Sequence, residues 1–172
     1  MNVKNNKRRK DSQEKIEKSF IDLLQTRELK DITVSDIIKS TGLNRSTFYA
    51  NYMDILDLAD KTRKNLENTF SNLFAEYDYF HERSGALLMF SHIKENQIFY
   101  KTYFKLCYDD KHLISTYDAE RARKECLDKN LVYHIEFFRN GLNSIIKLWL
   151  AGGCKESPEE MAQVLQQEYR GR

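Results

Sequence analysis

The sequence predicts an all-α protein in which a three-helix helix-turn-helix domain is followed by a helical bundle. The 172 residues include one proline and six glycines, and the helix-favouring residues Leu, Ile, Glu and Lys are abundant. Apolar residues recur every three to four positions over most of the chain, as in helices that bury one face. Between Thr33 and Tyr52, two such short segments flank a glycine, which is the pattern of a helix-turn-helix.

The first ten residues are polar and basic, and we expect a loosely ordered N-terminal arm there. Asp11 or Ser12 can cap a first helix, which is predicted to end near Arg27. The helix-turn-helix domain is predicted to span residues 11–57. It includes this first helix, because two short helices alone cannot enclose a core. The apolar face of the first helix consists of Ile16, Phe20, Leu23 and Leu24.

The helix-turn-helix carries its own start and stop signals. Thr33 can cap the first short helix with Asp36 as its partner, and Gly42 suits a turn with positive φ. The second helix, which Asn44 can cap, would enter the DNA major groove, where Arg45 could pair with a guanine edge. The residues predicted to contact DNA are Thr33, Asn44, Arg45, Ser46, Thr47, Tyr49 and Asn51.

Two packed helices with no nucleic-acid role would show the same spacing, so charge is a second criterion. Residues 1–52 hold 11 Lys and Arg against 7 Asp and Glu, a net charge of +4. The remainder holds 17 against 19, a net charge of −2. A basic N-terminal third is typical of a domain that faces nucleic acid, although a basic tail that only keeps the protein soluble gives the same difference.

Residues 58–172 are predicted to form the bundle, which shares a long helix with the first domain. No Pro or Gly interrupts this helix, so rigid coupling is expected. Ser157 and Glu160 form a capping box around Pro158 at the start of the last helix. The helices are predicted at about residues 54–80, 86–95, 96–106, 109–128, 130–151 and 158–169.

An a/d seam runs along the helix after Asn130, with apolar residues spaced 4, 3, 4, 3 and 4 apart. The seam predicts a dimer face beside the last helix, or else the core helix of a monomer. A single helix-turn-helix covers only a half-site, and two-fold dimers that read palindromes are common, so we favour the dimer. The predicted dimer residues are Leu131, Ile135, Phe138, Leu142, Ile145, Trp149, Met161 and Leu165.

The body is rich in aromatic residues, which could line an apolar pocket for a small-molecule inducer. Filling of a small helical core is the alternative role, and helical spacing favours it. The residues named for the pocket are Phe90, Tyr100, Tyr103, Phe104, Tyr133 and Phe137.

Residues 12–60 resemble the DNA-binding domain of the tetracycline repressor (TetR) family of bacterial regulators. The resemblance rests on ITVSDIIKSTGLNRSTFYANY followed by MDILDL, and above all on the Gly42-Leu43 turn, the TFY run and the aromatic Tyr52. It implies a dimeric repressor that binds a palindromic double-stranded DNA operator and responds to a small ligand. The body weakly resembles a small-bodied subgroup that includes regulators of dihydroxyacetone kinase genes.

The sequence departs from the family pattern at four positions, one of which is Ile38, where the family usually has alanine. Ile55, or its neighbour Asp54, stands where the family usually has a lysine that meets a phosphate, and Ala50 and Asn51 replace a pair such as Tyr-His. The arm, Lys7 to Lys10, could replace the lost contact by reaching a minor groove or the backbone. A different function therefore stays open, namely a coactivator or interaction module that binds a partner protein and does not read DNA alone.

Other classes of function lack a motif. The four histidines share no metal-binding spacing, and no nucleophile or phosphate-loop motif occurs, so no metal, cofactor or enzymatic activity is expected. The three cysteines are widely spaced, which argues against a disulfide framework. No stretch approaches the roughly 20 apolar residues of a spanning helix. We therefore expect a cytoplasmic protein without a membrane partner.

Overall fold

The computed structural model describes residues 3–74, 83–107 and 130–169, and these residues contain eight α-helices, one short 3-10 helix and no strand. The predicted all-α class is confirmed. The chain divides into two compact units, Met1–Asn68 with Thr102–Tyr108, and Thr69–Lys101 with Asp109–Arg172. The unit boundary falls inside helix α4 (Ile55–Phe74) and inside helix α6 (Gln97–Leu106), so both helices contribute to both units. None of the described helices combines the length and apolar character needed to span a membrane.

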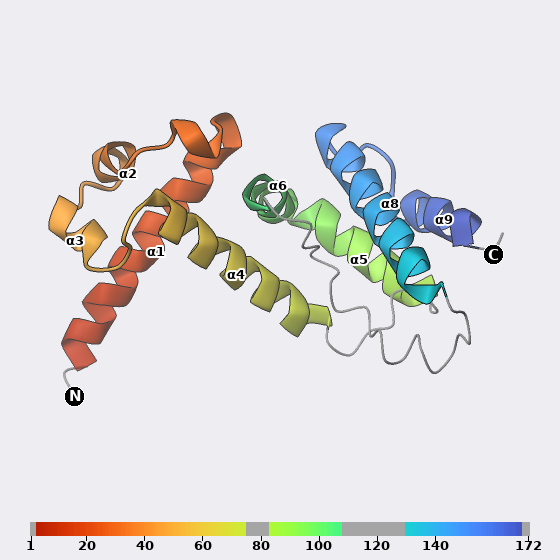
Figure 1. Cartoon of the computed structure of the whole chain (residues 1–172), viewed down its shortest axis with the longest axis horizontal. Helices are drawn as coiled ribbons and strands as arrows, with labels where there is room; N and C mark the ends of the chain where they lie inside the picture. The colour runs from red at the N-terminus through yellow and green to blue at the C-terminus, as the bar shows by residue number, and fades with distance from the viewer. Residues whose placement is uncertain (1–2, 75–82, 108–129, 170–172) are drawn as a thin grey trace. The chain divides into compact units, whose positions relative to one another are not determined.

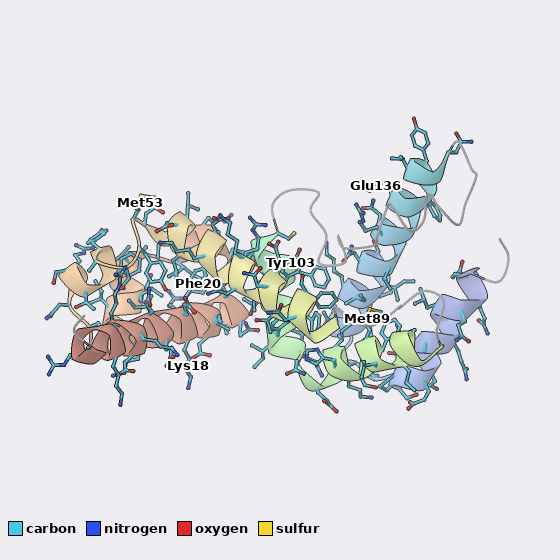
Figure 2. The ribbon with its side chains drawn as sticks, turned by 90° about the horizontal axis from the view of Figure 1, so that it is seen from below. Lys18, Phe20, Met53, Met89, Tyr103 and Glu136 are labelled. Carbon is cyan, nitrogen blue, oxygen red and sulfur yellow. The ribbon has the colours of Figure 1, made fainter. Side chains whose placement is uncertain are left out.

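The first unit is built on α1 (Val3–Thr26), which lies beside the shorter α2 (Val34–Thr41) and α3 (Arg45–Tyr49) (Figure 1). A 3-10 helix, Leu29–Asp31, connects α1 to α2. The predicted apolar face of α1 is present, and Figure 2 shows Phe20 between α1 and α4. The buried core of this unit comprises Ile16, Phe20, Leu24, Ile32, Ile37, Phe48, Tyr52, Leu58, Ala59 and Leu106.

Residues 3–10 are helical, which corrects the expectation of a loose arm for this part of residues 1–10. Helix α1 begins at Val3, and its first turns contain no Gly or Pro but several good helix formers. Ser12 is inside the helix and is not its cap, because its hydroxyl donates to the carbonyl of Arg8 (2.9 Å). Lys10 and Glu14 add an ion pair one turn apart (3.9 Å).

The end of α6 is fastened to the end of α1 within the first unit. The Lys105 ammonium donates to the carbonyls of Leu24 (2.6 Å) and Arg27 (3.4 Å). The Leu24 carbonyl belongs to the last turn of α1, whose carbonyls lack partners inside the helix, and Arg27 directly follows the helix. Gln25 of α1 also donates to the hydroxyl of Thr102 (3.0 Å). Residues about 80 positions apart in the sequence are thereby held together, since Lys105 and Leu24 are separated by 81 positions.

The second unit contains α5 (Arg83–Glu95), α8 (Leu131–Ala151) and α9 (Pro158–Tyr169) (Figure 1). Phe90 of α5 meets Trp149 of α8 edge to face, with ring centroids 5.5 Å apart. The predicted capping box of α9 is present, because the Glu160 carboxylate accepts from the Ser157 amide (2.6 Å) and the Ser157 hydroxyl accepts from the Glu160 amide (3.2 Å). The helix predicted at 109–128 lies outside the described residues.

The turn between α2 and α3 gives the first testable prediction. Gly42 has φ 68° and ψ 11°, a left-handed conformation that costs most residues about 1–2 kcal/mol. Gly42→Ala should therefore lower the free energy of unfolding by about this amount, measured by urea titration. A Cβ at this position would meet nothing within 4 Å, so the loss would come from the backbone alone. Gly42→Asn should lose less, because Asn tolerates this region; equal losses would point to a different cause.

Candidate nucleic-acid interface

The first half of the helix-turn-helix is held by a network around Thr33 and Asp36. The Asp36 carboxylate accepts from the Thr33 amide (2.9 Å), and the Thr33 hydroxyl accepts from the Asp36 amide (3.2 Å). Arg27 reaches the same carboxylate at 3.2 Å. The hydrogen bond from Thr33 is the main cause that lowers the pKa of Asp36, with Arg27 adding to it. Asp36 is therefore ionised at neutral pH, and the predicted capping box is present.

The turn places α3 by short contacts between consecutive residues. The Gly42 amide donates to the carbonyl of Ile38 (2.9 Å), which closes the end of α2. The Thr41 hydroxyl donates to the carbonyl of Ile37 (2.7 Å) and accepts from the Leu43 amide (3.3 Å). Helix α3 then begins at Arg45. Asn44 precedes it, but its side chain makes no capping hydrogen bond, so the predicted cap is absent.

Helix α3 has one buried side and one exposed polar side. Phe48 is fully buried and packs at 5.5 Å against Tyr49 and at 5.7 Å against Tyr52, measured between ring centroids. The Arg45 guanidinium is exposed and donates to the Ser35 hydroxyl (3.0 Å), which ties it to α2. Thr47 is half-buried. The predicted DNA contacts that lie exposed are Thr33, Asn44, Arg45, Ser46 and Tyr49.

Asn51 differs from the other predicted contacts, because its side chain is turned inward. It is only 8% exposed, its amide nitrogen donates to the Thr47 carbonyl (2.8 Å), and its amide oxygen accepts from Arg9 Nε (3.1 Å). With both ends of the amide engaged, Asn51 supports α3 and is not placed to contact DNA. The basic arm Lys7 to Lys10 includes Arg9, but nothing in the sequence indicated its contact with Asn51, which lies 42 positions away.

A second network below α3 was also not predicted. The Tyr52 phenol is buried and donates to the Glu17 carboxylate (2.9 Å), and burial is the main reason why the pKa of Tyr52 is raised. Lys61 lies 5.1 Å from the centre of the Tyr52 ring. Its ammonium donates to the Asp57 carboxylate (2.9 Å) and to the Asn51 carbonyl (3.1 Å). These contacts anchor the segment after α3 to α1 and α4.

Comparison with known proteins shows the family of this chain. A TetR family model, described as the C-terminal region of a transcriptional regulator, matches residues 65–170. The chain belongs to the TetR family of transcriptional regulators. The matched proteins are regulators and not enzymes.

Among relatives of this TetR-family chain is the HTH-type dhaKLM operon transcriptional activator DhaS of Lactococcus lactis subsp. lactis (strain IL1403). It is 32% identical over 102 residues, which cover 59% of this chain and 53% of that protein. The chain thus aligns with about half the length of this relative.

Two solved structures share the fold. A TetR transcriptional regulator from Streptococcus agalactiae 2603V has a TM-score of 0.74 at 21% identity, with 95% of this chain and 96% of that chain covered. A dihydroxyacetone kinase operon activator, DhaS, has a TM-score of 0.55 at 23% identity, with 91% and 92% covered. At these low identities, the similarity shows only that this TetR-family chain shares the fold of the two structures.

The aromatic residues predicted for a ligand pocket are not all interior. Phe90 and Tyr100 are fully buried in the second unit, whereas Tyr103 is buried in the first unit, where it contacts the half-buried Phe104. In α8, 76% of Tyr133 and 64% of Phe137 is exposed. These last two residues are therefore surface residues of the single chain, and they do not line an interior cavity with Phe90.

The residues predicted for a dimer face are also divided. Leu142, Trp149, Met161 and Leu165 are buried within the single chain, and Ile145 is half-buried. Buried side chains have no surface left to offer a partner. The structure describes the backbone of α8 at Leu131, Ile135 and Phe138 but not their side chains.

A different side of α8 is exposed, and we refer to it as the outer face of α8. Its residues recur every three to four positions, so they share one side of the helix. The outer face consists of Tyr133, Phe137, Gly141, Ser144 and Leu148, all of them exposed. It combines large apolar residues with two small ones, and Val164 of α9 is a further exposed apolar residue of this unit.

His92 in the body gives a prediction about pH. Its Nδ1 lies 2.7 Å from the Tyr100 hydroxyl, and burial lowers the pKa of His92 below 6.5, with Glu95 acting weakly in the opposite direction. The unfolded chain then binds the proton more readily than the folded chain. The free energy of unfolding should therefore fall as pH is lowered from about 6.5 towards the pKa of the folded state.

Urea unfolding at several pH values, together with an NMR titration of the imidazole, would measure this effect. His92→Gln should remove the part of the pH dependence that is due to this residue. An imidazole pKa at or above the ordinary value in the folded protein would contradict the prediction.

Proposed function

We propose that this TetR-family protein is a dimeric regulator that binds a palindromic DNA operator through α3. The observation that carries the proposal is the exposed polar side of α3, formed by Asn44, Arg45, Ser46 and Tyr49 on a buried Phe48. Arg45 is exposed and donates through one terminal nitrogen to Ser35, and an exposed guanidinium suits a bidentate contact with guanine. The exposed Ser46 hydroxyl suits a phosphate oxygen, whereas the Thr33 hydroxyl already donates to the Asp36 carboxylate (2.6 Å).

The second part of the proposal concerns the dimer. A pair of α3 helices can read a palindrome only if two chains are related by a two-fold axis. The outer face of α8 supports such an interface, because Tyr133 and Leu148 are large apolar residues that the single chain leaves 76% exposed. Gly141 and Ser144 between them are small, which would let the backbone of a partner helix approach closely.

The third part of the proposal concerns whether the protein represses or activates transcription, and how a small ligand would act on it. Repression by a small-molecule-responsive protein is the common mode in this family, but both relatives named DhaS are activators, which favours activation. A small-molecule effector would act through the aromatic core around Phe90 and Tyr100. A reporter fused to the promoter next to its own gene, in cells with and without the protein, decides between repression and activation.

A coactivator that binds a partner protein and does not read DNA alone is the second candidate. It is favoured by the start of α4, where 78% of Met53 and 65% of Leu56 is exposed and Ile55 carries no charge. Figure 2 shows Met53 pointing away from the first unit. Such apolar exposure beside α3 suits a protein surface better than a phosphate backbone.

DNA binding can be tested with promoter DNA from the neighbourhood of its own gene. The wild-type protein should bind specifically and with a strong salt dependence. Arg45→Ala should cost about 1–3 kcal/mol and relax the preference at one base pair, as measured by fluorescence anisotropy on a set of substituted duplexes. Arg45→Lys should keep general affinity but not the base preference, because the planar fork is lost.

Lys64→Ala is a suitable control, because Lys64 lies on α4 and is paired with Asp60 (2.7 Å). A wild-type protein that binds no DNA specifically would favour the coactivator. Equal loss on all sequences for Arg45→Ala would make Arg45 a phosphate contact.

The dimer can be tested by one substitution on the outer face of α8. Leu148→Glu should weaken dimerisation by about 2 kcal/mol or more, roughly thirtyfold in Kd, because a charge would be buried in the interface. The single chain should stay folded, since 76% of this side chain is exposed. Sedimentation at micromolar concentration measures the change.

Ile98→Glu is the matched control for this test. Ile98 is an apolar residue of α6 with a similar exposure, 57%, but it is not part of the outer face of α8. Its substitution should leave the dimer intact. A wild-type chain that sediments as a monomer, or equal effects of both substitutions, would contradict the assignment of this face.

A further inference from the structure

Helix α1 extends beyond the hydrophobic core of the first unit and carries Arg9 on its inward side. Ile16 and Phe20 mark this side, because both are fully buried. Arg9 precedes Ile16 by seven positions, which is two turns of an α-helix, so the two side chains lie on the same side. The inward side of α1 therefore carries a positively charged residue, Arg9, beyond the last residue of the hydrophobic core.

Arg9 is linked to the recognition helix by two consecutive hydrogen bonds. Its Nε donates to the Asn51 side-chain oxygen (3.1 Å), and the Asn51 side-chain nitrogen donates to the Thr47 carbonyl in α3 (2.8 Å). Asn51 is buried, whereas Arg9 is exposed. Since a guanidinium has five N–H donors, the contact through Nε fixes its position and leaves its terminal amino groups for another acceptor.

Among the residues that the structure describes, the start of α4 provides no comparable cation beside α3. Helix α4 begins with Ile55, Leu56 and Asp57, and Asp57 is held ionised mainly by the hydrogen bond from the Met53 amide, which lowers its pKa. Lys61 is engaged by the Asp57 carboxylate and by the Asn51 carbonyl. A DNA phosphate near the start of α4 would meet a carboxylate and apolar groups.

We propose that Arg9 is a phosphate-contacting residue of the DNA interface, and that Asn51 is the residue that positions it beside α3. The inference rests on the proposed DNA binding. A guanidinium matches the phosphate group with two parallel hydrogen bonds. Because Asn51 already holds the side chain, less conformational freedom is lost on binding than for a free lysine. The contact comes from a folded helix beside α3.

The test is the salt dependence of binding to a mixed-sequence duplex of about 30 base pairs, because phosphate contacts act on every sequence. Arg9→Gln should reduce the magnitude of the slope of log K against log salt by about 0.9. The ratio of wild-type to variant affinity should therefore fall about 3.5-fold as salt is raised from about 50 to 200 mM. Gln keeps the helix propensity and a hydrogen-bond donor for Asn51, so the protein should remain folded.

Two further variants separate a phosphate contact from a structural or general charge effect. Arg9→Lys keeps the charge and should keep the slope; a slope as low as that of Arg9→Gln would mean that Arg9 only supports the fold, and would overturn the proposal. Lys18→Gln is the matched control, because Lys18 lies nine positions, two and a half turns, further along α1 and points away from the unit (Figure 2). It should leave the slope unchanged.

If Arg9→Gln and Lys18→Gln reduced the slope of log K against log salt equally, Arg9 would contribute only general electrostatic attraction to DNA and not a specific phosphate contact. A wild-type slope for Arg9→Gln would contradict the phosphate contact while leaving the proposed DNA binding intact. Failure of the wild-type protein to bind any duplex would instead refute the proposed DNA binding itself.

Discussion

The position of α3 depends on the burial of Phe48. A helix of five residues is far below the length at which helices are stable in water, so α3 is held by its surroundings. Phe48 anchors one side of it in the core of the first unit, and Tyr52 follows directly with its phenol fixed to Glu17 of α1. Without these two aromatic residues, the exposed polar side of α3 would have no defined direction.

The family assignment and the helix-turn-helix geometry bear on different parts of the chain. The family model covers residues 65–170, whereas the exposed side of α3 belongs to the first unit. Helices α4 and α6 each pass from one unit into the other without a proline or glycine. Both helices are thus continuous across the unit boundary, and α6 ends near Lys105, which donates to the carbonyl of Leu24 in the last turn of α1.

Features that depend on neighbours in the sequence could be predicted, and those that depend on distant residues could not. The capping boxes at Thr33 and Ser157, and the left-handed Gly42, follow from signals within four residues. Asn51 was placed at the interface because its position follows α3, but its amide is turned inward by Arg9, 42 positions away. A single sequence contains no signal for such a contact.

The heptad pattern of α8 shows a related limit. An a/d seam identifies a buried side, but a core and an interface both bury apolar residues. Trp149 packs on Phe90 within the chain, and the exposed apolar residues occupy an adjacent side of the helix. The N-terminal segment shows the opposite case, because its basic composition suggested a loose arm although Lys and Arg are good helix formers.

The phenol of Tyr52 has a consequence for the conditions under which α3 keeps its place. Burial and the nearby Glu17 carboxylate both raise the pKa of this phenol, so it stays protonated and keeps donating well into the alkaline range. The phenol beneath α3 is therefore not deprotonated at neutral pH and remains a hydrogen-bond donor there. The residues of the first unit include no histidine, so the titration of His92, whose pKa is lowered by burial, belongs to the second unit.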